Sequence, residues 1–387
     1  MPRRGYYFPG DSMKKPALTI GYDGRPVVYR WTGMRTYTVS LIDHLLRLVP
    51  NVKVQIYYHH GEPDTAMANH PNLTWRSVSA PTGWWWTFFQ IPAVLRQEKV
   101  DLFHADYIVP PLASVPTVVT VHDAISALFL EPSDVKTRVL TNALTFLSVH
   151  RSRFVLVPSR SAQKDVARLF RAPLDRLVVT PYGVGAQFRP GDKKRAIQRL
   201  TDRFQLPESF ILTVNFFRPR KNAPLLAAAF RELKRRKVPV KGLVYVGGCP
   251  QSVREKVLLA AGEWGPFVHF TGYVDDEWLP DFYRACDVFA FPSLYEGFGL
   301  PVLEAMSCRA PVVVSDAPAL CELVGDAGRI VPAKSLKDLT DALEEILTSP
   351  DLREILSQRG RQRAEQFTWD QTARISWSVY QKAVGQL

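Results

Sequence analysis

The chain has 387 residues, a length that suits two domains better than one hydrophobic core. Hydrophobic residues make up 46% and charged residues 22%, a balance typical of globular proteins that argues against a disordered chain. No hydrophobic run approaches the roughly 20 residues needed to span a bilayer. The formal net charge of +12 is compatible with nucleic acid, an anionic membrane or a polyanionic substrate, and does not choose among them.

The positive charge is concentrated in the first half, where residues 1–190 carry 22 Lys and Arg against 13 Asp and Glu. Residues 1–17 are interpreted as an N-terminal tail, because they lack the continuous apolar region of a secretory signal. We therefore expect a cytoplasmic protein, with a peripheral position on the inner face of the membrane as a further option. Reduced thiols in hydrophobic surroundings are predicted for the four cysteines, Cys249, Cys286, Cys308 and Cys321.

Short β-branched runs alternate with helical patterns through the first half of the chain. Strands are predicted at residues 18–21, 52–58, 100–104, 116–122 and 154–158, with a helix at residues 35–48. Each strand is bounded by Pro, Asp or Ser and followed by a loop or helix. This alternation predicts a mostly parallel, doubly wound sheet.

The pattern breaks at residues 182–194 into Gly, Pro and charged residues, which is the best linker candidate. The alternation then restarts, with strands at residues 210–214, 242–246, 268–271, 288–291 and 311–314 and helices at 224–237, 253–261, 301–308 and 336–348.

We therefore predict an α/β protein with two Rossmann-like, doubly wound domains that face each other across a cleft. The N-terminal domain is expected at residues 18–189 and the C-terminal domain at residues 190–367. A last helical stretch, residues 368–387, is expected to return to the first domain. Ligands of such sheets bind beyond the carboxyl ends of the strands, so a bipartite ligand could be held from both sides.

The most informative stretch is residues 291–306, Phe-Pro-Ser-Leu-Tyr-Glu-Gly-Phe-Gly-Leu-Pro-Val-Leu-Glu-Ala-Met. It leaves a predicted strand, passes through Gly297 and Gly299, and enters a helix with proline at its first position. The free amides at such a helix start favour an anion. Glu304 could accept hydrogen bonds from both hydroxyls of a ribose, and Glu296 lies where it could reach a sugar hydroxyl. The alternative explanation is an ordinary helix start with acidic residues.

Three cations, Arg218, Arg220 and Lys221, follow the predicted strand at residues 210–214. Cations at the carboxyl end of a strand suit a diphosphate, although a solvated basic loop would explain them equally well.

Three further positions are weaker candidates. His122 ends an apolar strand, where a lone histidine is more often a structural hydrogen-bonding group than a catalyst. Gly33 lies in a loop just ahead of a helix and could allow close approach to a phosphate. His104 and Asp106 lie at another strand end.

Together these stretches resemble glycosyltransferase family 4. The resemblance rests on Glu296 and Glu304, with seven residues between them in the 291–306 stretch, and on four shorter segments: Pro-Arg-Lys-Asn at 219–222, Thr-Val-His-Asp at 120–123, Val-Pro-Ser-Arg-Ser at 157–161 and Phe-Thr-Trp at 367–369. It covers the chain from about Leu18 onward, and the double-glutamate segment is highly specific. It implies a GT-B fold and a retaining transferase that builds an α-linkage from a nucleotide diphosphate sugar. Residues 18–189 would then be the acceptor-side domain and residues 190–367 the nucleotide-sugar-binding domain.

The resemblance also implies residue roles. Arg220 and Lys221 would meet the donor diphosphate, and the backbone amide of Gly33 would approach the same phosphates from the first domain. His122 would contact the transferred sugar. The sugar and its phosphate would be held by four residues, Glu296, Phe298, Gly299 and Leu300.

Glu304 would bind the ribose, and the turn at Tyr273 and Val274 would line the base. The catalytic set implied is His122, Lys221 and Glu296. One departure matters: many relatives carry a Gly-Arg pair where this chain has Val214 and Asn215, so Arg218 is expected to replace the missing charge.

Metal-independent transfer is predicted, because the chain has no Asp-x-Asp segment and no clustered His and Asp suited to a divalent ion. Arg220, Lys221 and helix amides would supply the positive field at the leaving phosphate. Retention allows two routes, a covalent glycosyl-enzyme or attack on the face of the leaving group. The resemblance favours the second, with Glu296 as a positioning group.

The donor is the only small molecule expected, with no further cofactor. The motifs look most like those of bacterial mannosyltransferases, which favours GDP-mannose, with UDP-hexoses close behind. The acceptor is expected to be a glycan or a polyprenyl-linked sugar.

Residues 82–90 carry five aromatics within six positions, among them Trp84, Trp85 and Trp86. With the basic first half, this segment predicts docking on an anionic membrane face. The alternative is that these rings pack in the core or stack on acceptor sugars. Nucleic acid is not expected as a partner, because no aromatic RNA-binding stretch is present.

Competing functions are a nucleotide-sugar epimerase of similar fold, a glycogen-type phosphorylase with a lysine-bound pyridoxal cofactor, and a non-enzymatic basic protein that binds membrane or RNA. An epimerase would convert its donor without an acceptor, and donor protection against unfolding would separate an enzyme from a binding module.

Overall fold

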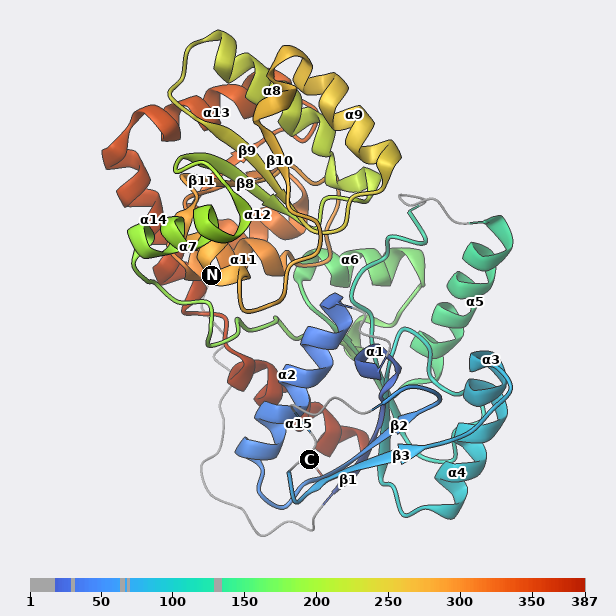
Figure 1. The fold of residues 1–387 in the computed structure, drawn as a ribbon. Coiled ribbons are helices and arrows are strands. Elements are labelled where there is room, and N and C mark those ends of the chain that lie inside the picture. Colours follow the sequence, from blue (N-terminus) through green and yellow to red (C-terminus); the bar gives the residue numbers. More distant parts are fainter. Residues whose placement is uncertain (1–17, 29–31, 63–66, 68–69, 129–133, 387) are drawn as a thin grey trace.

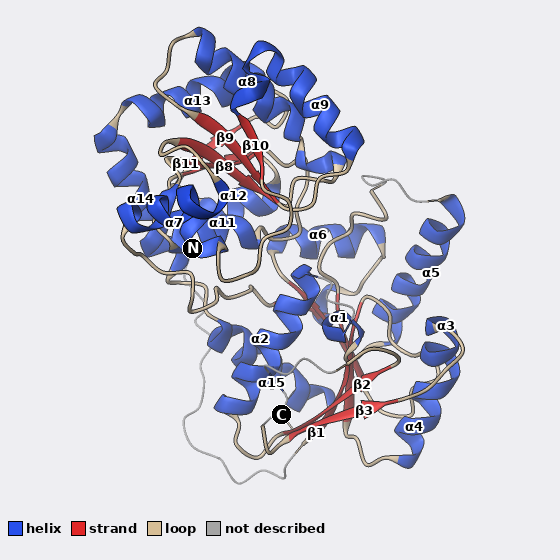
Figure 2. Ribbon diagram, viewed as in Figure 1, coloured by secondary structure: helices blue, strands red, loops and turns tan. Residues whose placement is uncertain are grey.

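The protein forms two α/β lobes in a computed structural model that describes residues 18–28, 32–62, 67, 70–128 and 134–386 (Figure 1). The predicted N-terminal tail, residues 1–17, lies outside the described residues. In each lobe, helices cover both faces of one twisted sheet (Figure 2). The predicted fold class, two doubly wound α/β domains, is therefore confirmed.

The first lobe is built on seven parallel strands in the order β3-β2-β1-β4-β5-β6-β7. The strands are β1 (Thr19–Asp23), β2 (Lys53–Tyr58), β3 (Leu73–Ser77), β4 (Leu102–Asp106), β5 (Thr117–Thr120), β6 (Phe154–Val157) and β7 (Leu177–Val179). Successive strand residues point to opposite faces, so each central strand contributes to two hydrophobic layers. In β4, Leu102 joins one layer and Phe103 the other.

The helices of this lobe are α1 (Arg25–Val28), α2 (Thr32–Leu48), α3 (Gly83–Trp85), the π-helical turn η2 (Trp86–Gln90), α4 (Ile91–Gln97), α5 (Val135–Arg151), α6 (Arg160–Leu169) and the 3-10 turn η3 (Leu174–Arg176). Buried residues of η2, α4, α5 and α6 share one core cluster, so these four elements cover the same face of the sheet. The opposite face is covered by α2.

The second lobe has six parallel strands in the order β10-β9-β8-β11-β12-β13. They are β8 (Phe210–Val214), β9 (Gly242–Val246), β10 (Val268–Phe270), β11 (Val288–Phe291), β12 (Val312–Ser315) and β13 (Arg329–Val331). One face packs against α8 (Ala223–Arg235), α9 (Gln251–Ala261) and α13 (Leu336–Thr348). The other packs against α7 (Lys193–Phe204), α10 (Leu279–Ala285), α11 (Leu300–Ser307) and α12 (Pro318–Val324). The remaining elements are η4 (Pro219–Lys221), η5 (Gly262–Phe267) and α14 (Pro350–Ala364).

The last helix, α15 (Trp369–Ala383), leaves the second lobe and lies beside α2 in the first (Figure 1). Nδ1 of His44 lies 2.6 Å from a carboxylate oxygen of Asp370 across this contact. Tyr380 reaches further in, to the buried His104 of β4, at 2.7 Å. The C-terminal segment therefore completes the layer that covers one face of the first sheet.

Several sequence predictions differ from the structure in detail. The edge strands β3, β7 and β13 were not predicted. Helix α2 begins at Thr32, so Gly33 lies in its first turn and not in a loop ahead of it. All four cysteines are free thiols, and Cys286 and Cys308 are buried. None of the described helices is long and apolar enough to cross a membrane.

Both sheets reverse their strand order at one point, between β1 and β4 in the first lobe and between β8 and β11 in the second. Loops that leave neighbouring strands in opposite directions open a crevice at such a point, and ligands of doubly wound sheets bind there. In the second lobe, the predicted cation segment follows β8 and the double-glutamate segment follows β11. The topology therefore brings these two motifs to the same sheet edge.

Candidate active site

The double-glutamate segment forms a tight loop between β11 and α11. Helix α11 starts at Leu300 with a proline in its first turn, and Gly299 precedes it with a φ of 112°. This backbone conformation favours glycine, and a Cβ there would also crowd Cδ2 of Leu320, at 2.7 Å. No side chain caps the helix, which leaves its first amides for a ligand.

The loop after β8 and the loop after β11 are joined by a buried ion cluster. A carboxylate oxygen of Glu296 accepts hydrogen bonds from Nη1 of Arg220 at 2.8 Å and from Nζ of Lys221 at 2.6 Å. Backbone bonding supports the cluster, since the amide of Leu294 donates to the carbonyl of Arg220 at 2.7 Å. The ammonium of Lys221 also lies 4.4 Å from the ring centre of Phe291. Three residues implied at the donor site are thus brought together.

Two cations meet one carboxylate oxygen in this cluster. Burial alone would raise the pKa of Glu296, but Lys221 and Arg220 together hold it below its usual value, so the carboxylate is ionised near neutral pH. Burial raises the pKa of the nearby Asp123, and Arg220 partly opposes this rise. Fixed cations such as Arg220 and Lys221 suit a diphosphate.

Glu304 lies inside the same helix in a less polar setting. Burial raises the pKa of its carboxyl to about 8, partly opposed by a hydrogen bond that it accepts from the hydroxyl of Tyr283 at 2.9 Å. The two glutamates of the motif therefore differ in charge at neutral pH. Glu296 is ionised and paired with cations, whereas Glu304 is largely protonated when no ligand adjusts its surroundings.

His122 lies beyond the end of β5 in the first lobe and is buried. Its Nδ1 is hydrogen-bonded to the hydroxyl of Tyr182, and its Nε2 lies 3.3 Å from Oδ1 of Asp106. Its backbone faces the other lobe: a Cβ at Gly297 would lie 2.0 Å from the carbonyl oxygen of His122. The imidazole is thus held within its own lobe, while the main chain touches the donor loop.

Direct contacts close the two lobes on each other around the donor loop. The hydroxyl of Ser159 donates to the carbonyl of Gly297 at 2.8 Å, and the hydroxyl of Tyr295 donates to Asp165 at 2.9 Å. On the other side, Nη1 of Arg35 lies 3.8 Å from a carboxylate oxygen of Asp276. The start of α2, with Gly33, is thereby near the turn that carries Tyr273 and Val274.

Other predicted donor-site residues are arranged less closely around the cluster. The guanidinium of Arg218 lies 5.3 Å from the ring centre of Phe217 on the exposed side of the loop. Tyr273 is exposed and Val274 is buried, so only the former presents its side chain to solvent. Phe298 is buried against Tyr182, with ring centres 5.0 Å apart.

The prediction that Trp86 contacts a membrane or acceptor is wrong, because its side chain is 0% exposed and belongs to the core. The guanidinium of Arg25 lies 4.5 Å from its ring centre. Trp84 and Trp85 are 45% and 47% exposed. The sequence could not separate three adjacent tryptophans, since only the turn from α3 into η2 decides which of them points inward.

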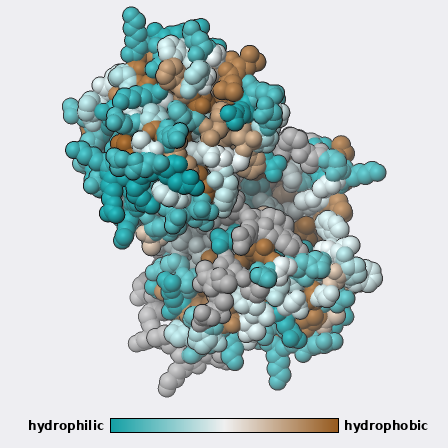
Figure 3. All heavy atoms as spheres, viewed as in Figure 1, coloured by the Kyte–Doolittle hydropathy of each residue, from teal (hydrophilic) through white to brown (hydrophobic). Residues whose placement is uncertain are grey.

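Helix α5 also carries large exposed hydrophobic residues. They are Val135, Val139, Leu140, Phe146 and Leu147. Hydrophobic side chains reach the surface along the edge of the first lobe where α5 lies (Figure 3). Nothing in the sequence pattern had drawn attention to this helix.

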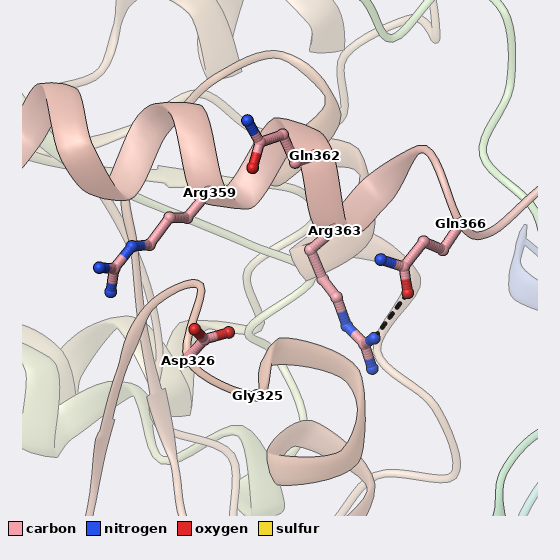
Figure 4. A pocket seen from close by; sticks show the side chains of 6 residues that line it. All are labelled: Gly325, Asp326, Arg359, Gln362, Arg363 and Gln366. Carbon is pink, nitrogen blue, oxygen red and sulfur yellow. Dashed lines mark hydrogen bonds between the residues drawn. The ribbon is translucent and has the colours of Figure 1, made fainter. Parts of the chain in front are cut away.

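A pocket of about 400 Å³ lies outside the crevice, between the end of α12 and α14 (Figure 4). It is lined by Gly325, Asp326, Arg359, Gln362, Arg363 and Gln366. Arg363 already donates to the carbonyl of Leu323 and to Gln366 at 2.9 and 2.8 Å. Its cation therefore serves to cap the end of α12, and none of the predicted site residues lines this pocket.

Metal-ligating side chains are not grouped in the part of the chain that the structure describes: no set of three or more His, Cys, Asp or Glu could hold an ion there. Site-related residues missed from the sequence are Tyr182 and Asp123, whereas Asp106 was a weak candidate at a strand end. Asp123 lies in the predicted Thr-Val-His-Asp segment, but its burial near Arg220 depends on contact between the lobes. Tyr182 falls in the linker, where no periodic pattern marks a buried residue.

Comparison with known proteins agrees with this architecture. The "Glycosyltransferase Family 4" model matches residues 31–188, and the "Glycosyl transferases group 1" model matches residues 196–363. The chain is 28% identical over 393 residues to the O-antigen chain mannosyltransferase B of Escherichia coli, covering 94% of this chain and 99% of that protein.

Two solved structures show the same arrangement of lobes. Sucrose-phosphate synthase from Thermosynechococcus elongatus has a TM-score of 0.73 at 20% identity, over 95% of this chain and 99% of that one. Anabaena HepE in complex with UDP-glucose has a TM-score of 0.71 at 17% identity, over 94% of this chain and 99% of that one. The chain therefore has the GT-B fold, with two Rossmann-like lobes.

The match is more specific than the fold class. The two family models together account for both lobes, and the full-length similarity is to a bacterial mannosyltransferase. The chain belongs to glycosyltransferase family 4, as its motifs predicted.

Proposed function

We propose that this glycosyltransferase moves a hexose, mannose first among the candidates, from a nucleotide diphosphate sugar to a glycan or lipid-linked acceptor. The observation that carries the proposal is the buried cluster of Arg220, Lys221 and Glu296 beside the uncapped start of α11. Two cations are thus fixed beside the place where a diphosphate would lie. Fixed charges in a water-poor site stabilise a departing phosphate strongly, and this is often the largest catalytic contribution.

In this proposal Lys221, Arg220 and the amides of Gly299 and Leu300 hold the diphosphate, with the amide of Gly33 approaching from the first lobe. The set provides positive charge without carboxylates free to hold a divalent ion, which supports metal-independent transfer.

Glu304 would accept hydrogen bonds from the ribose hydroxyls, and the turn at Tyr273 and Val274 would line the site of the base. His122 would contact the transferred sugar, and Phe298 would help to hold the sugar and its phosphate. Arg218, exposed beside the cluster, would add charge where Asn215 cannot.

Transfer is proposed to proceed with retention, through attack of the acceptor hydroxyl on the face that the diphosphate leaves. The leaving phosphate oxygen would take the acceptor proton as the glycosidic bond to the donor breaks and the new bond forms. Oε1 of Glu296 is held by Arg220 and Lys221, which supports a role in orienting the sugar. A covalent sugar on Glu296 after reaction with a trapping donor would contradict this mechanism.

The donor preference rests on the similarity to a bacterial mannosyltransferase, which favours GDP-mannose, while the HepE structure holds UDP-glucose. A panel of nucleotide sugars in a thermal-shift assay, followed by transfer assays with EDTA, tests it. We expect GDP-mannose to stabilise the protein most and transfer to continue in EDTA. Stabilisation by no nucleotide sugar, or loss of transfer in EDTA that added Mg²⁺ restores, would contradict the proposal.

A peripheral position on an anionic membrane is proposed for the acceptor-side lobe, with Trp84 and Trp85 as contact residues. Helix α5 covers the same sheet face as η2 and α4 and exposes its own apolar residues. The segments 83–97, 135–151 and 160–169 carry seven Lys and Arg against one Asp. Exposed apolar side chains among cations suit an anionic lipid surface, which would place a lipid-linked acceptor near the crevice.

Sedimentation with vesicles of anionic or neutral lipid tests this position. Replacing Trp84 and Trp85 with Ala should reduce binding to anionic vesicles, as should replacing Val139 and Leu140 with Ser. The control is Leu259→Ser on α9 of the second lobe, since Leu259 is 81% exposed. Equal binding by all variants, or no preference for anionic lipid, would remove the membrane role.

A further inference from the structure

The chain crosses between the lobes twice, and both crossings meet at Tyr182. The amide of Val184 donates to the carbonyl of Phe367, and the hydroxyl of Thr372 donates to the carbonyl of Pro181 at 2.6 Å. At Gly183, an added Cβ would lie 2.0 Å from the backbone nitrogen of Trp369. The two crossing segments are therefore in direct backbone contact.

The ring of Tyr182 is buried at this junction and touches three separate parts of the molecule. Its centre lies 5.0 Å from that of Phe298 in the donor loop and 4.9 Å from that of Tyr37 in α2. It stacks on Trp369 at the start of α15, with centres 5.9 Å apart and planes 17° apart. A displacement of the donor loop would therefore change the packing of this ring directly.

The hydroxyl of Tyr182 points the other way, to Nδ1 of His122. The second ring nitrogen, Nε2, lies 3.3 Å from Oδ1 of Asp106, and neither atom has a hydrogen-bond partner among the described residues. A carboxylate oxygen facing Nε2 favours a proton on that nitrogen, which leaves Nδ1 to accept from the phenol. Burial raises the pKa of Tyr182 well above its usual value, so the phenol keeps its proton.

We propose that Tyr182 is a positioning residue for His122. It fixes the tautomer and orientation of the imidazole when the donor loop is packed against its ring. The proposal rests on the proposed contact between His122 and the transferred sugar. The ring of Tyr182 packs against Phe298 of the donor loop. Its hydroxyl is hydrogen-bonded to His122 and keeps the imidazole beside Asp106. The position of the donor loop and the orientation of the His122 ring are thereby coupled, although Tyr182 touches no reacting atom.

The test is Tyr182→Phe, which keeps the ring contacts and removes the hydroxyl. Because a misplaced group near the reacting centre lowers turnover more than ground-state binding, we expect kcat to fall about tenfold or more while KM for the donor changes less than about twofold. The melting temperature should change little, since the ring remains packed.

A matched control exists in Tyr380→Phe. Tyr380 is also buried and also hydrogen-bonds the Nδ1 of a buried histidine, His104, at 2.7 Å, but it lies on α15 away from the donor loop. Its loss should leave kcat within about twofold of the wild type. Equal losses of kcat in both variants, or unchanged kcat in Tyr182→Phe, would overturn the proposal.

The tautomer supplies a readout that does not need turnover. With ring-¹⁵N histidine, the wild type should show one dominant tautomer for His122, assigned by the missing signal in His122→Gln. In Tyr182→Phe the signals should move towards a mixture, whereas in Tyr380→Phe they should stay. An unchanged His122 spectrum in Tyr182→Phe would also overturn the proposal. A wild type that transfers no sugar from any donor would refute the proposed function, while the spectra would still decide the role of Tyr182.

Discussion

Glu304→Gln should make the protein more stable at alkaline pH and should weaken donor binding. In the folded protein, burial raises the pKa of Glu304 to about 8, against an ordinary value of 4.5. Between these values the folded state holds a proton that the unfolded state has lost. Stability therefore falls as pH rises through this window, and the loss is complete above about pH 8. Below pH 4.5 both states are protonated and the carboxyl makes no difference to stability.

The size of the effect follows from the width of that window. Each pH unit within the window lowers the free energy of unfolding by about 1.4 kcal/mol, so the total loss is at most about 5 kcal/mol. Because Glu304 is partly exposed and water screens its charge, we expect about 2–3 kcal/mol. Glutamine does not titrate, yet it still offers an oxygen to the hydroxyl of Tyr283, so the variant should escape most of this loss.

Urea unfolding at pH 5, 6.5 and 8.5 measures the difference, with Glu255→Gln on the exposed face of α9 as the control. The free energies of unfolding of wild type and Glu304→Gln should be similar at pH 5 and should diverge by pH 8.5. Donor affinity of the wild type should rise as pH approaches about 8, because a ribose is bound best by the ionised carboxylate, and Glu304→Gln should lack this rise. Parallel stability curves for the two proteins would refute the reasoning.

Two further predictions concern the donor loop. Lys221→Ala removes the cation that lies 2.6 Å from Glu296, so transfer should fall by about a thousandfold or more while circular dichroism shows an intact fold; near-normal turnover would remove the assignment of the diphosphate site. Gly297→Ala places a Cβ 2.0 Å from the carbonyl oxygen of His122, which should hold the lobes apart and enlarge the radius of gyration in X-ray scattering. The control Gly265→Ala, whose nearest neighbour would be 3.6 Å away, should scatter like the wild type.

The central strands could be predicted because each is a continuous hydrophobic run. Strands β8, β9 and β11 begin and end where the sequence placed them. Such runs are typical of parallel strands that are covered on both faces. The edge strand β3 escaped notice because it holds polar and exposed residues such as Arg76. At β7, three residues are too few for a pattern to form.

The site was predictable as far as topology determines it. Parallel strands deliver their following loops to one edge, so Lys221 and Glu296 were expected near one donor, although their direct ion pair was not foreseen. The pairing of His122 with Asp106 and Tyr182 could not be predicted, because it joins a strand end, a neighbouring strand and the linker. Their separation in sequence gives no local pattern from which contact could be inferred.

The charge balance of the crevice gives the strongest physical support to the metal-free proposal. A divalent ion needs ionised carboxylates as ligands, and the two glutamates of the donor segment are poorly suited to that role. Oε1 of Glu296 is held by Arg220 and Lys221, and Glu304 has a pKa of about 8. The cations fixed beside this segment are Arg220 and Lys221. A pyrophosphate entering this crevice would meet positive charge already fixed in place, which is the role that a bound cation would otherwise have to fill.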